Sequence, residues 1–281
     1  MMLGVKQLML KNLFKNKMFI FSLFILIPMF IISIIGPLLA PYDPLVQDSA
    51  NTLQPSSGEH ILGTDEYGRD ILSRLLIGVR PTIIIALVST VLSMLAGVTL
   101  GVLAGYVKGI LETIILRSLD IVLSFPPILL ALIVVGFWGA GLKNMIFVIS
   151  IVYVPYFARV AHSATVQITE LEFVESEISL GASFFRIIRK SILPNILSPL
   201  IIQMSLTFAA VILLASGLSF LGLGIIPPDP DWGQMIGVAR GYIYQNPMYV
   251  IWPSIFLGLT ILAVNLMGDS LRDILDPKLK R

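Results

Sequence analysis

The side chains that most enzymes use for covalent, redox or metal chemistry are scarce in this chain. It has no cysteine, which excludes a thiol nucleophile, a disulfide and a Cys-ligated metal. Its two histidines, His60 and His162, lie far apart, and neither belongs to an H-E-x-x-H pair. No G-x-x-x-x-G-K-S/T phosphate-binding loop occurs. We therefore expect no enzyme activity, no metal site and no cofactor here, so that any ATP and Mg²⁺ must bind a separate polypeptide.

One polar segment, between His162 and Asn195, carries residues whose spacing indicates a function. Its charged side chains after His162 are Glu170, Glu172, Glu175, Glu177, Arg186, Arg189 and Lys190. In so apolar a chain, these charges must lie in water or against another protein. Thr169 and Glu172 fit a capping box, which predicts that a helix starts there.

A second short helix is expected over residues 183–193, after a turn at Gly181 and before Pro194, which should end it. Apolar residues occupy two faces of the first helix, with Val174 on one and Phe173 nearly opposite, which predicts a helix wedged between two apolar surfaces. Anionic lipid headgroups are the alternative contact, because the second helix has a basic face. The glutamates argue against lipid for the first helix, so we predict docking on a protein partner.

Composition places the rest of the chain in a membrane. Of 281 residues, 56% are hydrophobic and 13% charged, with a mean hydropathy of +0.92, whereas soluble domains are about 25% charged. A spanning helix needs roughly 20 apolar residues. The uncharged runs are Met18–Ala40, Pro81–Val107, Ile121–Leu142, Asn144–Ala158 (continuing past Arg159), Asn195–Pro228 and Tyr249–Gly268. They predict an all-α, multi-pass protein of the cell membrane with about six spanning helices.

The positions of basic residues predict the orientation. Of the 19 Lys and Arg residues, the outer segments hold only Arg69, Arg74, Arg80, Lys143 and Arg240 if the N-terminus is cytoplasmic. Cytoplasmic loops carry the excess of Lys and Arg. Both termini and the polar segment around Glu175 are therefore expected on the cytoplasmic side, where ATP is found.

These expectations divide the chain into consecutive segments. The predicted order is a cytoplasmic tail (1–17), a first transmembrane helix (18–40), an extracytoplasmic segment with an interfacial helix (41–80), a transmembrane core (81–268) and a cytoplasmic tail (269–281). Within the core, a cytoplasmic coupling loop covers 166–195 and an extracytoplasmic loop covers 225–248.

The two outer segments each allow two interpretations. The helix near residues 71–80 either lies on the outer membrane surface, with Arg69, Arg74 and Arg80 pointing outward, or contacts a binding protein or the pore mouth. The stretch from Pro227 to Trp232 is either a rigid loop with its tryptophan at the membrane interface or a contact with a binding protein.

Five polar residues within the spans are possible pathway-lining groups: Ser89, Ser93, Gln203, Ser205 and Asn265. Hydroxyl groups in spans more often bond their own helix or join neighbouring helices. Gly97, Gly101 and Gly105, at four-residue spacing, predict a face for close helix packing.

Several motifs, in this order, resemble the second permease subunit of the dipeptide, oligopeptide and nickel class of ABC importers. The coupling-loop signature corresponds to Glu175-Ser176-Glu177, Gly181 and Ile192-Leu193-Pro194. The others are LGTDEYGRDILSRLL (62–76), SFPPILLAL (124–132), GLSFLGLGIIPPDPDWGQM (217–235) and NLMGDSLRDILDPKLKR (265–281). Family members usually carry small residues after the glutamate; Ser176 keeps this, and Glu177 departs from it.

The resemblance implies the type I importer permease fold and half of a translocation pathway for peptides or a related solute, such as a nickel complex. It also implies a second homologous permease as a heterodimer partner, two ATPase subunits docked on the coupling loop and an extracytoplasmic substrate-binding protein, with no role for nucleic acid. The alternative is an ATP-independent secondary transporter or channel. That alternative predicts a mid-membrane ionisable residue or inverted repeats, and neither is present in the sequence.

Overall fold

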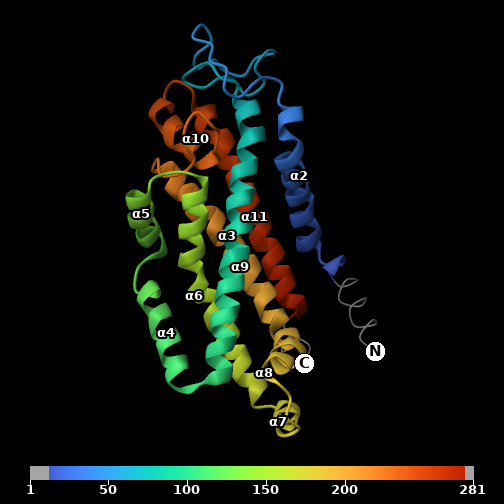
Figure 1. The fold of residues 1–281 in the computed structure, drawn as a ribbon. Helices are drawn as coiled ribbons and strands as arrows, with labels where there is room; N and C mark the ends of the chain where they lie inside the picture. Colours follow the sequence, from blue (N-terminus) through green and yellow to red (C-terminus); the bar gives the residue numbers. More distant parts are fainter. Residues whose placement is uncertain (1–12, 276–281) are drawn as a thin grey trace.

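A computed structural model describes residues 13–275, and the ordered elements of this range are helices joined by loops (Figure 1). Residues 1–12 and 276–281 of the predicted tails lie outside the described residues, and the predicted tail boundary at residue 269 is wrong because residues 269–275 continue α11. The elements are α2 (Lys17–Leu39), α3 (Ile71–Val107), α4 (Gly109–Leu123), α5 (Pro127–Trp138), α6 (Leu142–Thr169), α7 (Glu172–Ser179), α8 (Phe184–Ile187), the π-turn η1 (Ile188–Ile192), α9 (Leu193–Phe220), α10 (Trp232–Ala239), the 3₁₀ turn η2 (Arg240–Tyr242) and α11 (Pro247–Leu275).

Five helices are long and apolar enough to cross a membrane, or six if the bent pair α4 and α5 counts as one span. This confirms the predicted all-α, multi-pass architecture. The run Ile121–Leu142, expected to form one helix, is divided between α4 and α5, which meet at an angle of 85°. Pro126 and Pro127 follow the break, and a proline both lacks a backbone donor and disfavours helix at the residue before it.

The long helix α3 corrects the predicted boundary at residue 80. Residues 71–80 are its first turns rather than a separate interfacial helix. Ile71, Leu75 and Val79 are fully buried among other side chains instead of facing lipid. Of the three arginines expected to point outward, Arg69 and Arg74 are buried, and Arg80 alone is exposed.

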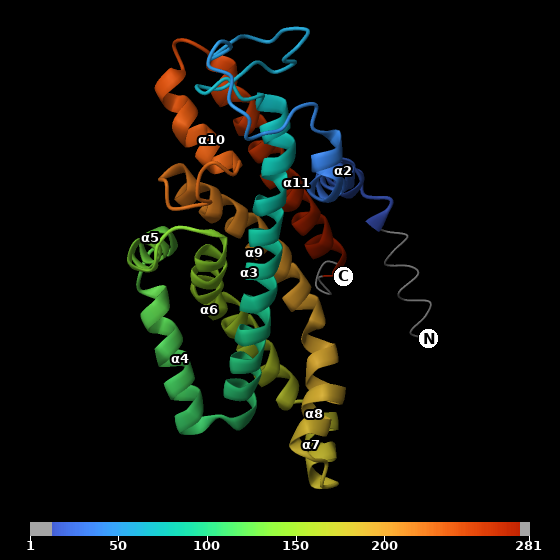
Figure 2. The same ribbon diagram turned by 45° about the horizontal axis from the view of Figure 1, so that its top comes forward.

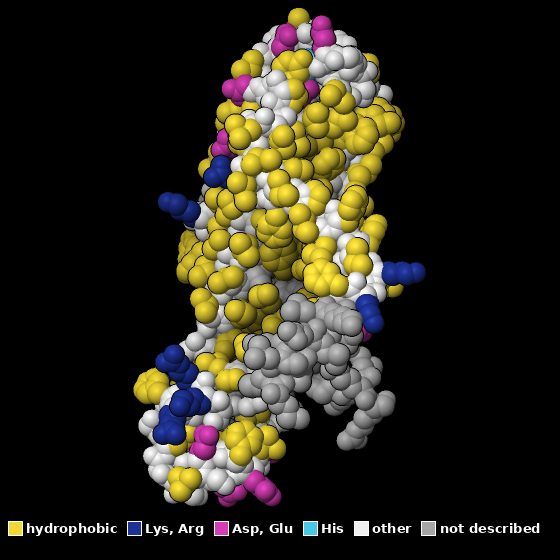
Figure 3. Space-filling model, turned by 90° about the vertical axis from the view of Figure 1, so that its right-hand side faces the viewer, with side chains coloured by type: hydrophobic (Ala, Val, Ile, Leu, Met, Phe, Trp, Pro, Cys, Tyr) yellow, Lys and Arg dark blue, Asp and Glu magenta, His cyan; other side chains and the backbone are white. Residues whose placement is uncertain are grey.

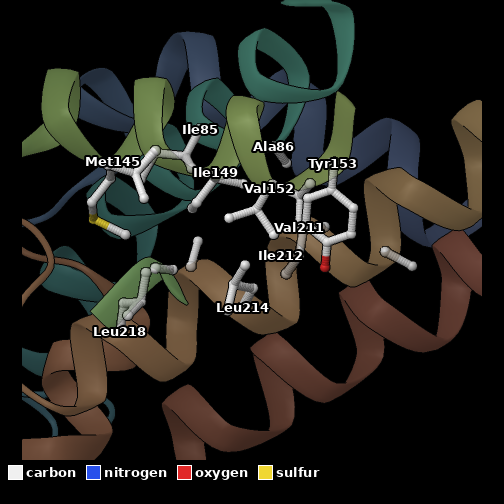
Figure 4. Close-up of a cluster of buried hydrophobic side chains, with 14 of the residues drawn as sticks. Ile85, Ala86, Met145, Ile149, Val152, Tyr153, Val211, Ile212, Leu214 and Leu218 are labelled. Atoms are coloured by element: carbon white, nitrogen blue, oxygen red, sulfur yellow. The ribbon is translucent and has the colours of Figure 1, made fainter. Parts of the chain in front are cut away.

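The centre of the bundle is formed by α3, α6 and α9, and buried side chains from these helices meet between them (Figure 4). The predicted glycine face is confirmed at the contact of α3 with α6. A Cβ atom at Gly97, Gly101 or Gly105 would overlap backbone or side-chain atoms of α6 between residues 154 and 165. Small residues let two helix backbones approach closely, which favours packing in a membrane.

The two ends of the molecule differ in kind. At one end lies the outer cap, which comprises residues 41–70 and the segment 222–246 with α10; at the other end lies the inner tip, residues 170–193 with α7 and α8 (Figures 1 and 2). The α2 start and the α11 end lie on the side of the inner tip. On the face shown in Figure 3, apolar side chains dominate the middle, as expected of a membrane protein; acidic side chains lie mostly toward the two ends, and some basic side chains project from the sides between them.

Buried charges hold the outer cap together. The Asp65 carboxylate accepts from Arg69 Nε at 2.6 Å and lies 3.3 Å from Arg74 Nε. Arg74 Nη1 donates to the carbonyls of Pro44 at 2.9 Å and Pro228 at 3.3 Å. Arg74 therefore ties both parts of the cap to α3, and burial is tolerated because the charges are paired.

Trp232 is the apolar anchor of the cap. Its side chain is fully buried, packs on Gly78, and donates from Nε1 to the Leu75 carbonyl at 3.0 Å. The placement of Trp232 at the membrane interface is therefore wrong, whereas a contact of the stretch from Pro227 to Trp232 with a binding protein stays a prediction. The tryptophan instead fastens α10 to α3, because its polar atom needs a partner when the ring is buried.

Candidate coupling site and pathway

The inner tip begins directly after the membrane helix α6, which ends at Thr169. The predicted capping box is wrong: α7 starts at Glu172 with Leu171 at its cap position, and Thr169 Oγ1 instead donates to the Val166 carbonyl at 2.9 Å. Glu172 and Glu175 lie in the first turn of α7, where the positive end of the helix dipole stabilises carboxylates.

Gly181 ends α7 through a left-handed turn, as the sequence predicted. Its φ is +77°, its amide donates to the Ile178 carbonyl at 2.9 Å, and the Ala182 amide donates to the Glu177 carbonyl at 3.0 Å. These two bonds form a Schellman motif, in which glycine avoids the steric cost of a Cβ atom. The chain reverses here and returns to the membrane.

The helix that follows Gly181 does not end at Pro194, contrary to the sequence expectation. α8, η1 and α9 form one continuous helical run from Phe184 to Phe220. Pro194 lies in the first turn of α9, where the π-turn η1 has already altered the hydrogen-bond pattern and a missing amide donor costs little. The tip is therefore a direct extension of a spanning helix.

One side of the inner tip is anchored. Val174, Ile187 and Ile192 are fully buried in a cluster that continues into α6 and α9. Glu177 adds a polar tie, because its carboxylate accepts from Ser191 Oγ at 2.7 Å. Glu177 is the position that departs from the family pattern, and here it joins α7 to η1.

The other side of the inner tip exposes large apolar side chains. These are Leu171, Phe173, Ile178, Leu180 and Phe185, of which Leu180 is 88% and Phe185 81% exposed. Glu175, Ser176, Gly181 and Pro194 are exposed as well, while Leu193 is partly buried. The tip projects beyond the bundle (Figure 2). A contiguous group of exposed apolar side chains marks an interaction surface.

Three polar contacts hold α4 near α6 and its C-terminal end. His162 Nε2 lies 2.7 Å from Glu112, Arg159 lies 2.6 Å from Asp120, and Lys108 lies 3.9 Å from Glu170. Sequence reasoning missed these pairs. The sequence feature that indicates such pairs is the presence of opposite charges at similar depths on neighbouring spans.

The possible pathway-lining residues separate into two groups. Ser89 and Ser93 are buried between α3 and α6, and their hydroxyls donate to the carbonyls of Ile146 at 3.2 Å and Ser150 at 2.8 Å. In this conformation they join helices and cannot line a pathway, because a partner chain can only bury them further.

The other three candidates lie on α9 and α11. Ser205 is buried, donates to the Ile202 carbonyl at 2.8 Å and contacts α11 near Gly268. Gln203 is partly buried and donates to Thr207 Oγ1 at 3.0 Å, while Asn265 is exposed. Gln203 and Asn265 therefore remain as the accessible polar candidates of this set.

Comparison with known proteins identifies the family. Residues 97–281 match the family model "Binding-protein-dependent transport system inner membrane component". The chain belongs to this family. Residues 6–55, which include α2, match the N-terminal transmembrane domain of oligopeptide transport permease C. This protein is thus a multi-pass permease subunit of the C type, as the resemblance in its sequence implied.

Relatives cover nearly the whole length of the permease. It is 40% identical over 270 residues to the dipeptide transport system permease DppC of Alkalihalophilus pseudofirmus, covering 96% of this chain and 89% of the relative. It is 40% identical to the di/tripeptide permease DppC of Pseudomonas aeruginosa, covering 88% and 84%. It is 41% identical to the glutathione permease GsiD of Pectobacterium atrosepticum, covering 80% and 75%.

Solved structures support the fold. A chain of the MetNI methionine ABC transporter in an inward-facing conformation matches this permease with a TM-score of 0.59. The match covers 72% of this chain and 96% of that chain at 22% identity. At this identity the likeness concerns the fold alone.

Proposed function

We propose that this permease imports peptides, as half of a translocation pathway whose other half is a second, homologous permease. The observation that carries the proposal is the inner tip, a helix–glycine–helix element that exposes apolar side chains on one side and continues into α9 on the other. Peptide substrates are supported by the names of the dipeptide and di/tripeptide relatives. A nickel complex has less support, because the relatives cited above transport peptides or glutathione.

The inner tip is the docking surface for a separate ATPase subunit. Leu180 and Phe185 would enter an apolar groove, while Glu175 offers a charge at the edge of the contact. ATP and Mg²⁺ bind the ATPases, and this chain performs no catalysis. An extracytoplasmic binding protein delivers the peptide at the outer cap.

Force can pass from the tip to the membrane because the connection is mechanically stiff. α8, η1 and α9 are one helical run, and the buried cluster around Ile187 and Ile192 prevents the tip from turning independently. A displacement of the docked ATPase would therefore move α9, and with it the central contacts to α3 and α6.

Co-purification with the ATPase subunits tests the docking surface. Phe185→Ser should lower ATPase recovery and peptide uptake about tenfold or more, because central apolar anchors contribute roughly 2–4 kcal/mol to binding. Phe137→Ser is the matched control, since Phe137 is 87% exposed on α5, away from the tip. Recovery of the ATPases with the Phe185 variant at the wild-type level would contradict the docking role.

Orientation and substrate need separate measurements. A cysteine introduced at Ser176 should resist a membrane-impermeant thiol reagent in intact cells, and it should react once the cells are permeabilised. Labelling in intact cells would place the tip outside and overturn the mechanism. ATP-independent peptide uptake by the purified complex would instead favour a secondary transporter.

A further inference from the structure

A cavity with a volume of about 450 Å³ lies near the outer cap, at the extracytoplasmic end of the spans. It is formed by α3, the turn between α5 and α6, and the loop that leads to α10. Ile77, Ile84, Leu142 and Ile226 give it apolar walls. This volume falls within the range of about 300–1,000 Å³ that is typical of small-ligand pockets.

Two opposite charges also line this cavity. Arg80 on α3 and Asp229 on the loop are both exposed, and within residues 13–275 neither forms an ion pair. The neighbouring cap behaves differently, because Arg69 and Arg74 are buried against Asp65. Arg80 and Asp229 are therefore not needed to hold the cap together, and both charges remain available to a ligand.

We propose that this cavity is an outer subsite for a zwitterionic peptide. The Arg80 guanidinium would bind the C-terminal carboxylate of the peptide, because its fixed donors match a carboxylate in pairs. The Asp229 carboxylate would bind the N-terminal ammonium, and the apolar walls would accept side chains of varied shape. The proposal rests on the peptide import proposed above and adds the residues that receive the substrate.

A phosphatidylethanolamine headgroup carries the same pair of charges, so it is the competing occupant. A bound lipid also needs a groove for its acyl chains along the spans. The lining residues of this cavity on α3 extend only from Ile77 to Ile84, and the remaining lining residues lie in or next to loops. A compact, loop-capped cavity of this shape suits a short peptide better than a lipid.

Transport by the complete permease complex tests the subsite. The complex is reconstituted in vesicles with its ATPases and binding protein, an equimolar mixture of dipeptides is supplied, and imported peptides are quantified by mass spectrometry. Arg80→Gln and Asp229→Asn should each lower the peptide imported per ATP hydrolysed about tenfold. The binding-protein-stimulated ATPase rate should stay unchanged, because docking is intact.

Matched controls separate a local role from a general charge effect. Lys143→Gln and Glu59→Gln remove exposed charges of the same signs outside the cavity lining and should leave the import ratio unchanged. The exchanged pair Arg80→Asp with Asp229→Arg should recover part of the import, since a zwitterion can reverse its direction.

Each of the other possible results contradicts one specific part of the proposal. Wild-type-like import by both cavity variants contradicts the subsite while leaving peptide import intact. A loss of ATPase stimulation assigns these charges to docking of the binding protein, and a defect confined to phosphatidylethanolamine vesicles assigns them to lipid. If the wild-type complex imports no dipeptide, the proposed function fails, and the subsite fails with it.

Discussion

The outer cap and the inner tip are both polar ends of an apolar bundle, yet they satisfy their side chains in opposite ways. In the cap, charged groups are buried and paired with each other, as Asp65 is with Arg69 and Arg74. In the tip, apolar groups such as Leu180 and Phe185 are exposed, and the charged groups other than Glu177 are exposed as well. Contacts within the cap therefore stabilise it, whereas the tip exposes an apolar surface that no described residue covers.

The connections to the membrane differ in the same way. The cap is joined to α3 and α11 through several contacts, including the hydrogen bond from Tyr249 Oη to Glu66 at 2.6 Å. The tip meets the bundle through the cluster around Ile187 and through the unbroken run into α9. Substitutions in the cap should therefore change stability, and substitutions in the tip should change coupling at nearly constant stability.

The largest effect is expected in the cap from Asp65→Ala. The change leaves two buried arginines without their shared carboxylate, and breaking a buried charge pair costs about 3–5 kcal/mol. Thermal unfolding in detergent should show a clear loss of stability and reduced yield. Asp43→Ala, at an exposed cap position, is the control; equal melting temperatures for the two variants would contradict the contrast between cap and tip.

Gly181→Val in the tip should cause a smaller change in stability and a large change in activity. The left-handed conformation of Gly181 costs other residues about 1–2 kcal/mol, but no heavy atom lies within 4 Å of a Cβ there. The protein should insert and fold, with ATP hydrolysis uncoupled from peptide uptake. Gly58→Val, at an open position without a positive φ, should leave both rates unchanged.

Glu175→Arg tests the same difference between cap and tip without changing the backbone conformation. Glu175 is exposed, and none of its side-chain contacts hold the tip together in the described residues. Uptake should fall strongly, with the stability of the isolated permease changed by no more than about 0.5 kcal/mol. Unimpaired uptake by this variant would remove Glu175 from the docking surface.

The tie between Glu177 and Ser191 should contribute a modest amount. A double-mutant cycle with Glu177→Gln and Ser191→Ala should give a coupling energy of about 0.5–1.5 kcal/mol in unfolding measurements. A coupling energy of zero would show that the bond does not fasten α7 to η1. Glu177 would then act, like Glu175, only at the surface of the tip.

The smallest effect is a pH dependence in the cap. Burial raises the pKa of the Asp231 carboxyl above its ordinary value of 3.8, so the folded state holds this proton more tightly than the unfolded state. Stability should fall as pH rises from about 4 through the raised pKa, by at most about 1.4 kcal/mol per pH unit. Asp231→Asn keeps a side chain that can cap α10, and it should remove this component from the pH profile.

Features that depend on local geometry could be predicted from the sequence. Gly181 was placed in the turn of the tip because a left-handed residue after a helix favours glycine. The glycine face of α3 followed from its four-residue repeat. Positive residues and apolar run lengths gave the membrane architecture, because the bilayer imposes both.

Features that depend on distant partners could not be predicted. Ser93 bonds to a carbonyl 57 positions away in α6, and Trp232 bonds to one 157 positions away in α3. Nothing in the local sequence distinguishes Arg74, which is buried, from Arg80, which is exposed six residues later on the same helix. The structure also shows that the helix continues through Pro194, where the sequence analysis expected it to end.

The sequence by itself determined that this protein spans a membrane and that its charged loop is a helix–glycine–helix element. These properties follow from hydropathy, charge placement and backbone sterics, which act over a few residues. Only the tertiary structure decided which charges are paired in the cap, which serines join helices and which apolar residues remain exposed. Those outcomes depend on side chains that folding brings together from distant helices, where burial and pairing set the energy.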